Sequence, residues 1–279
     1  MKRLERLSPA CLRILGGNPG KFSLQGTNTY LIGTGPHRLL IDTGHGVPTW
    51  IATLNKTLAD EKATIQSALL THWHPDHIGG RDPEDHDGWR DIADGQVFRV
   101  EGATLRAVHT PGHTTDHMVF VFQEEDALFT GDNVLGHGTA VFEDLQTYLQ
   151  SLAKMEGLVA GRGYPGHGAV LPEARAKIAE YISHRHERER QVLKVLGSAK
   201  SSEAGIDDGD AATNRIARPD HWTAMELVKV IYKSYPESLH GPASAGVLQI
   251  LQKLRAEGKV ASEDDDSWRL LPQEDRSSL

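Results

Sequence analysis

Four side chains that can bind a metal ion lie close together in this chain, namely His72, His74, Asp76 and His77. Imidazole nitrogens and carboxylate oxygens both suit zinc and similar divalent ions. Ligands packed this densely would repel one another without a cation. An apolar run at 65–70 precedes the cluster and two glycines follow it, which predicts a loop at the end of a strand. The spacing therefore predicts a metal site on a rigid scaffold.

Three further ionisable side chains occur downstream in similar settings, at His113, Asp132 and His167. Each lies beside a glycine at the end of a segment with strand character. Glycine permits the tight turns and close backbone approach that a crowded metal site requires. A single histidine of this kind is more often structural, but four such segments in one chain indicate a common site.

The ordered motifs resemble those of the metallo-β-lactamase superfamily. The resemblance begins at 26–30, includes 42–44 and extends to His167. The resemblance implies two metal ions, each with its own ligands and with one ligand in common. One ion would be held by His72, His74 and His113, the other by Asp76, His77 and His167, with Asp132 as the bridge. Asp42 would orient ligands without binding metal.

The chemistry implied is hydrolysis without a serine or cysteine nucleophile. Two divalent cations about 3.5–4 Å apart lower the pKa of a water between them and stabilise a developing oxyanion. Asp76 is expected to be a ligand and also to orient the nucleophile or accept its proton. Zinc is the default metal, and the mixed nitrogen and oxygen ligands also admit manganese. Cys11, the only cysteine, is expected to be buried packing.

The element pattern predicts an α/β domain over 1–197, because apolar runs alternate with amphipathic segments. Helices are expected at 50–58, at 145–152 and from Pro172 towards Leu196. The superfamily resemblance implies that these elements form a four-layer αβ/βα sandwich with the metal ions at one edge.

A second, smaller module is expected at 221–279, after a small and polar linker at 198–220. Thr223 and Glu226 form a capping-box pattern ahead of a helix, and a second helix and a hairpin are expected near 243–257 and 260–271. This order resembles a winged helix. The acidic run 263–266 disfavours a phosphate-reading wing, so a packing or substrate-covering role is expected.

Composition favours a protein that binds neither nucleic acid nor membranes. The formal net charge is −8, whereas a general nucleic-acid binder needs a basic surface. The chain contains no stretch of about 20 apolar residues, which a membrane-spanning helix requires. The single cysteine fits a reducing compartment, and we expect a cytoplasmic location.

A closer resemblance is to the lactamase-beta-like 2 group, through 26–31, 131–139, 142–145 and 225–228. One branch of this group contains mitochondrial endoribonucleases that cut single-stranded RNA. The other contains fungal thioesterases that release aromatic polyketides from a synthase lacking its own releasing domain. Segments 48–50 and 132–138 are more similar to the second branch.

The fungal branch implies a particular partner and reaction. The partner is the acyl carrier protein of a non-reducing polyketide synthase, and release occurs by hydrolysis or by Claisen cyclisation. The ribonuclease is the alternative, and a non-enzymatic protein with a structural metal is a third hypothesis. His137, in a glycine-rich loop, is a candidate substrate contact. The chain is also short between Gly80 and Asp94, where the group has a strand and a helix that flank the active-site mouth.

Overall fold

The computed structural model describes residues 1–80, 88–198, 220–264 and 266–272. It divides into two compact units, Met1–Ile182 and Ser183–Leu279, which we call unit 1 and unit 2. The division falls within the long helix α4 (Ala174–Leu196). The domain limits expected at 197 and 221 stay predictions, and residues 199–219 of the expected linker lie outside the described residues.

The first sheet of unit 1 contains five strands in the order β1-β2-β3-β4-β5. Neighbouring strands are antiparallel except β4 and β5, which are parallel and are joined through helix α1 (Pro48–Asp60). A parallel pair needs such a crossover, and the crossover places a helix against one face of the sheet. The bounds are Leu4–Ser8, Cys11–Leu15, Asn28–Ile32, His37–Ile41 and Thr64–Leu69.

The second sheet also contains five strands, in the order β10-β9-β8-β7-β6. Its bounds are Val97–Val100 (β6), Ala103–His109 (β7), Met118–Phe122 (β8), Ala127–Gly131 (β9) and Gly163–Pro165 (β10). Only β9 and β10 are parallel, and α3 (Leu145–Glu156) lies between them in the chain. The Asp144 carboxylate caps the N-terminus of α3 by accepting a hydrogen bond from the Thr147 N–H.

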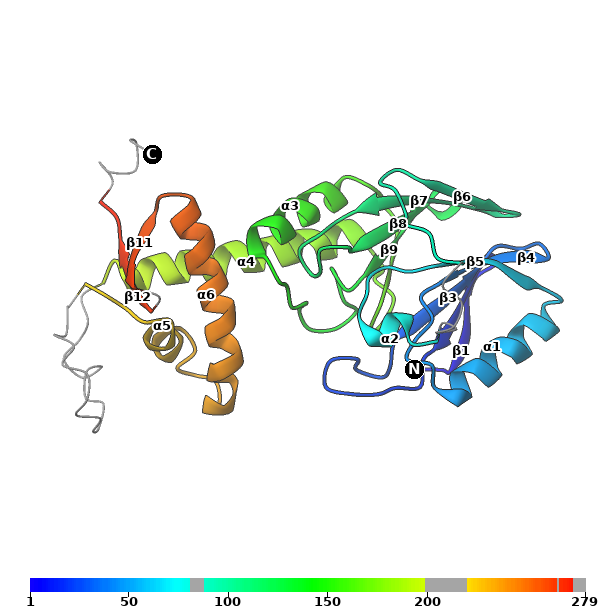
Figure 1. The fold of residues 1–279 in the computed structure, drawn as a ribbon, viewed down its shortest axis with the longest axis horizontal. Helices are drawn as coiled ribbons and strands as arrows, with labels where there is room; N and C mark the ends of the chain where they lie inside the picture. Colours follow the sequence, from blue (N-terminus) through cyan, green and yellow to red (C-terminus); the bar gives the residue numbers. More distant parts are fainter. Residues whose placement is uncertain (81–87, 199–219, 265, 273–279) are drawn as a thin grey trace. The chain divides into compact units, whose positions relative to one another are not determined.

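Alternation along β4 shows how the layers are built. Leu39 and Ile41 are buried between the two sheets with Phe120 and Phe129, while Leu40 faces the other way, onto Trp50 of α1. Successive strand side chains point to opposite faces, so both faces of this strand are buried. In Figure 1, α1 covers the outer face of the first sheet, and α3 with the beginning of α4 covers the second. The expected four-layer sandwich is confirmed.

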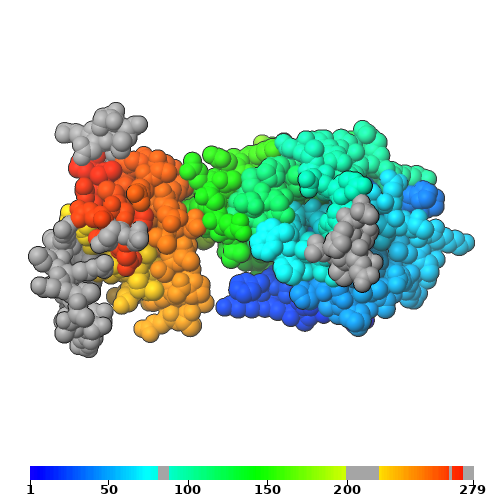
Figure 2. Space-filling view, viewed as in Figure 1, coloured from blue at the N-terminus to red at the C-terminus, as the bar shows by residue number. Residues whose placement is uncertain are grey.

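Unit 2 contains the rest of α4, helices α5 (Ala224–Ile231) and α6 (His240–Ala256), and the hairpin β11 (Val260–Asp264) and β12 (Ser267–Leu270). The predicted capping box is present, since Thr223 and Glu226 exchange hydrogen bonds. Trp222 and Trp268 pair through their backbones at 2.8 and 3.0 Å. The orange surface in Figure 2 belongs to α6. This order of helices and hairpin is the expected winged-helix arrangement.

Residues 88–94 contain neither helix nor strand, in keeping with the short connection expected after Gly80. Among the described residues, β5 is the outermost strand of its sheet. Within the same part of the chain, no helix has the length and hydropathy needed to cross a bilayer.

Candidate metal centre

The seven predicted ligands lie in four segments, each of which follows a strand. His72 and His74 follow β5, and Asp76 and His77 lie on the short helix α2 (Pro75–Ile78). His113 lies between β7 and β8, while Asp132 and His167 follow β9 and β10. The structure brings these side chains into three overlapping groups whose ligand atoms lie within 4.8 Å of one another.

The first group consists of three imidazoles. His74 Nδ1 lies 2.9 Å from His72 Nε2 and 3.1 Å from His113 Nε2. The other ring nitrogen is already bonded in two of these histidines, since His72 Nδ1 contacts the Thr71 hydroxyl and His113 Nδ1 donates to the Val141 carbonyl. Both rings therefore turn the Nε2 lone pair towards His74.

The second group combines Asp76, His77 and His167. His167 Nε2 lies 3.2 Å from Asp76 Oδ2 and 3.3 Å from His77 Nε2. His77 donates from Nδ1 to Asp42 Oδ2 at 2.7 Å, so its Nε2 is also left facing the group.

Asp132 forms the third group with His72 and His77, and it lies between the other two groups. Its Oδ2 is 3.2 Å from His167 Nε2 and 3.9 Å from His113 Nε2. Its Oδ1 is buried without a hydrogen-bond partner, which is costly unless a cation compensates it. This oxygen lies 3.5 Å from His77 Nε2. Together with the facing imidazole nitrogens it fits divalent cations, and in particular it fits zinc-type ligand chemistry.

Asp42 supports the ligands through hydrogen bonds, and it has a strained backbone conformation with φ of 57°. Its carboxylate accepts hydrogen bonds from His77 and from both the N–H and the hydroxyl of Thr71. Thr71 in turn contacts His72. One buried carboxylate thus fixes the ring orientation of a histidine in each group.

Two supporting residues were missed by the sequence reasoning. His117 is fully buried, and its Nε2 accepts a hydrogen bond from the Asp132 N–H at 3.1 Å. The Thr27 hydroxyl donates to Asp76 Oδ2 at 2.9 Å. The spacing of His117 four residues after His113 was an available signal, but nothing in the sequence places Thr27 beside Asp76.

The histidines of the centre fall into two classes, one with a raised pKa and one with a lowered pKa. Burial would lower the pKa of His167, but Asp132 and Asp76 raise it to about 9. Burial would likewise lower the pKa of His77, which Asp132 and Asp42 hold well above its usual value. The pKa of His72 is instead lowered, by burial and by His77. Before a cation binds, the acidic side of the centre therefore holds protons while His72 is neutral.

The exposed part of the centre is at His74 and Asp76, which are only partly buried. Trp73, between two histidines, is 50% exposed, and its ring lies 4.7 Å from that of His74. His137 is exposed and lies outside the three ligand groups. Its loop is nonetheless tied to the centre, because the Gly136 N–H donates to the His167 carbonyl at 2.9 Å.

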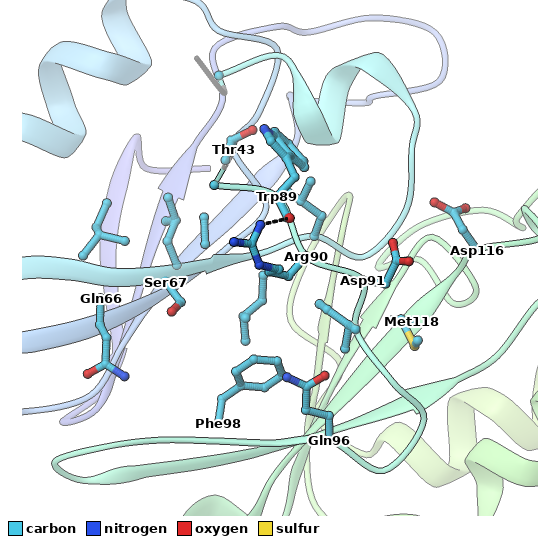
Figure 3. Close-up of a pocket in the computed structure, with 18 of the residues that line it drawn as sticks. Thr43, Gln66, Ser67, Trp89, Arg90, Asp91, Gln96, Phe98, Asp116 and Met118 are labelled. Atoms are coloured by element: carbon cyan, nitrogen blue, oxygen red, sulfur yellow. Dashed lines mark hydrogen bonds between the residues drawn. The ribbon is translucent and has the colours of Figure 1, made fainter. Parts of the chain in front are cut away.

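A separate cavity of about 1160 Å³ lies along β5 and β6. Ser67, Arg90 and Phe98 line it from different sides (Figure 3). None of the seven predicted ligands lines this cavity, although Gly80 and Met118 are near them in sequence. It is therefore distinct from the exposed side of the centre at His74.

The fold and this cluster are those of a metal-dependent hydrolase. Comparison of the chain with known protein families identifies which family it belongs to. The Metallo-beta-lactamase superfamily matches residues 23–83 and 81–167, and a Beta-lactamase associated winged helix domain matches 223–268. The chain belongs to the metallo-β-lactamase superfamily. Among solved structures, a beta-lactamase domain protein from Burkholderia ambifaria aligns with a TM-score of 0.73 at 17% identity, over 96% of this chain and 93% of its own.

Several fungal proteins are similar to this chain over most of its length. Lactamase-like protein ptaB of Pestalotiopsis fici is 46% identical, over 92% of this chain and 84% of its own length. A protein of Aspergillus chevalieri named Atrochrysone carboxyl ACP thioesterase is 44% identical, over 93% of this chain and 85% of its own length. The similarity therefore includes both the sandwich and the winged helix.

Proposed function

We propose that this protein is a metal-dependent thioesterase that releases an aromatic polyketide from the acyl carrier protein of a non-reducing polyketide synthase. The observation that carries the proposal is the convergence of seven ligand-type side chains in a chain of this family. The similarity to a relative named as an ACP thioesterase supports the substrate class. Release by hydrolysis and release by Claisen cyclisation both fit such a site.

We assign the ligands as two sets around one shared carboxylate. His72, His74 and His113 would hold one cation, and Asp76, His77 and His167 the second. Asp132 would contact both, which its distances to His113 and His167 support. Seven ligands exceed what one tetrahedral ion uses, and zinc is the expected metal with manganese also suited to the set.

The bound cations would supply Lewis-acid activation of the thioester carbonyl and of the nucleophile. The chain itself provides proton transfer and orientation. Asp76 has a pKa below its usual value, because hydrogen bonding to His167 and the proximity of His77 outweigh burial. It is therefore an ionised acceptor, and the Thr27 hydroxyl fixes its Oδ2.

Trp73 supplies an aromatic surface for the acyl group. Its half-exposed indole lies beside His74, so a planar polyketide can stack on it next to the reacting carbonyl. His137, on the loop that follows Asp132, stays a second candidate contact. We also retain the predicted cytoplasmic location as part of the proposal.

The test is turnover by metal-loaded protein of an aromatic acyl group carried on a purified carrier domain. Product release should depend on the metal, which elemental analysis should show at about two per chain. Trp73→Ala should raise KM for an aromatic acyl thioester more than for an aliphatic one. If the acyl group stays tethered while single-stranded RNA is cut in a metal-dependent way, the ribonuclease function is correct instead.

A further inference from the structure

Unit 2 has a groove of about 520 Å³ between α4 and α5. Aliphatic side chains of Val195, Val230 and Ile231 line it together with the cationic Arg188 and Lys194. The remaining lining residues are uncharged, namely Gln191, Ser198 and Tyr235. The groove therefore combines an aliphatic surface with cationic and uncharged polar side chains.

Its charge is opposite to that of the whole chain. None of the eight lining residues is acidic, although the chain carries a formal charge of −8. The neighbouring acid Glu187 is already engaged by Arg190 and Gln191. Lys194 is exposed and pairs with no acid in the described part of the chain. Among the described residues, the lining of the groove thus carries two positive charges and no negative charge.

The groove is also prearranged for binding. The Arg188 guanidinium lies 4.2 Å from the centre of the Tyr232 ring, and it donates to Gln191 at 2.9 Å. Val230 is 45% exposed and Tyr235 is 50% exposed. A partner that covers them would remove apolar surface from water while finding a fixed cation at the border.

We propose that this groove docks an acidic amphipathic helix of the acyl carrier protein. The inference rests on the proposed function, because a thioester tethered to a carrier protein reaches the enzyme only if the two proteins meet. The apolar side of the helix would lie on Val195, Val230 and Ile231. Its acidic side chains would pair with Arg188 and Lys194.

A nucleic acid fits the same surface less well. A single strand binds along a continuous positive track with aromatic rings for its bases. This groove offers two cations and one aromatic ring, and aliphatic side chains form the rest of its apolar surface. The observations therefore favour a protein helix.

The experiment measures the affinity of the full-length protein for a fluorescent carrier domain from a non-reducing synthase. Lys194→Glu should weaken binding about tenfold, and so should Val230→Ser, a change that leaves the charge unaltered. Arg255→Glu is the matched control, since Arg255 is an exposed cation of α6 outside the groove. Its affinity should stay within about twofold of the wild type. An acid-to-lysine substitution on the carrier helix should restore binding to Lys194→Glu.

Turnover separates this inference from the proposed function. A small thioester without a carrier should react equally with wild type and Lys194→Glu, whereas the carrier-bound substrate should react more slowly with the variant. Groove-dependent carrier binding without any thioester turnover would support docking and overturn the proposed function. If neither groove substitution changes the affinity for the carrier domain, the docking proposal is wrong. Lys194-dependent binding of a short oligouridine in place of the carrier would also overturn it.

Discussion

The carboxylate of Asp76 takes part in two interactions that an amide would change. It contacts His167 at 3.2 Å and accepts the Thr27 hydroxyl at 2.9 Å. Asp76→Asn preserves the shape of the side chain but removes its charge, so proton acceptance should be lost while the fold is kept. We expect a fall in kcat of about 10²- to 10⁴-fold with little change in the unfolding temperature. Near wild-type turnover would show that another group accepts the proton.

The raised pKa of His167 predicts that metal binding releases protons. With a pKa of about 9 before a cation binds, the ring is protonated at neutral pH and must lose that proton to become a ligand. Release should be largest below the pKa and should decline above it, where the ring is already neutral. Calorimetric titration with zinc in two buffers of different ionisation enthalpy measures this release.

The control for this titration is His137→Ala, which removes an exposed histidine from outside the ligand groups. It should release as many protons as the wild type. Equal binding enthalpies in the two buffers would contradict the expected protonation of the centre.

At the scale of elements, the loop after β10 approaches the centre so closely that only glycine fits. A Cβ on Gly166 would lie 2.3 Å from Asp132 Oδ1 and 2.8 Å from His77 Cε1. Gly166→Ala should therefore displace the shared ligand Asp132 and His77 of the second group, and it should lower metal affinity by at least about 10-fold, as loss of ligand orientation does elsewhere. Gly157→Ala is the control, because nothing lies within 4 Å of that position. Metal content after dialysis, together with circular dichroism, provides the readout.

The contrast between Gly166 and His117 shows what could be read from the sequence. The expected ligands follow strands and lie next to glycines, which are local patterns and predict the loops correctly. His117 acts through the backbone of Asp132, and Thr27 acts through a contact between segments far apart in the chain. Each contact joins loops at the strand ends of one sheet, so it depends on the order of strands in that sheet, and only the spacing of His113 and His117 gave a local signal. The cavity beside β5 was not indicated by the sequence either.

At the scale of the whole molecule, all three candidate ligand groups belong to unit 1. Metal bound only by the folded state adds stability, about 4 kcal/mol at a thousandfold excess over Kd. Removing metal with a chelator should therefore speed hydrogen exchange in β8 and β9 and leave α5 and α6 unchanged. Mass spectrometry of peptides from both units measures this. Equal acceleration in α6 would show that the two units unfold together.

The uncharged edge of β5 has a consequence for how the protein behaves at high concentration. From Thr64 to Leu69 the strand carries no charge and no proline, and it is the outermost strand of its sheet among the described residues. An edge strand without charged residues can extend its hydrogen bonding onto a second chain, and a lysine on the edge opposes this. Gln66→Lys should slow self-association, measured by light scattering over time, whereas Gln150→Lys adds the same charge on α3 and should not. If light scattering rises equally slowly in both variants, net charge rather than the strand edge controls self-association.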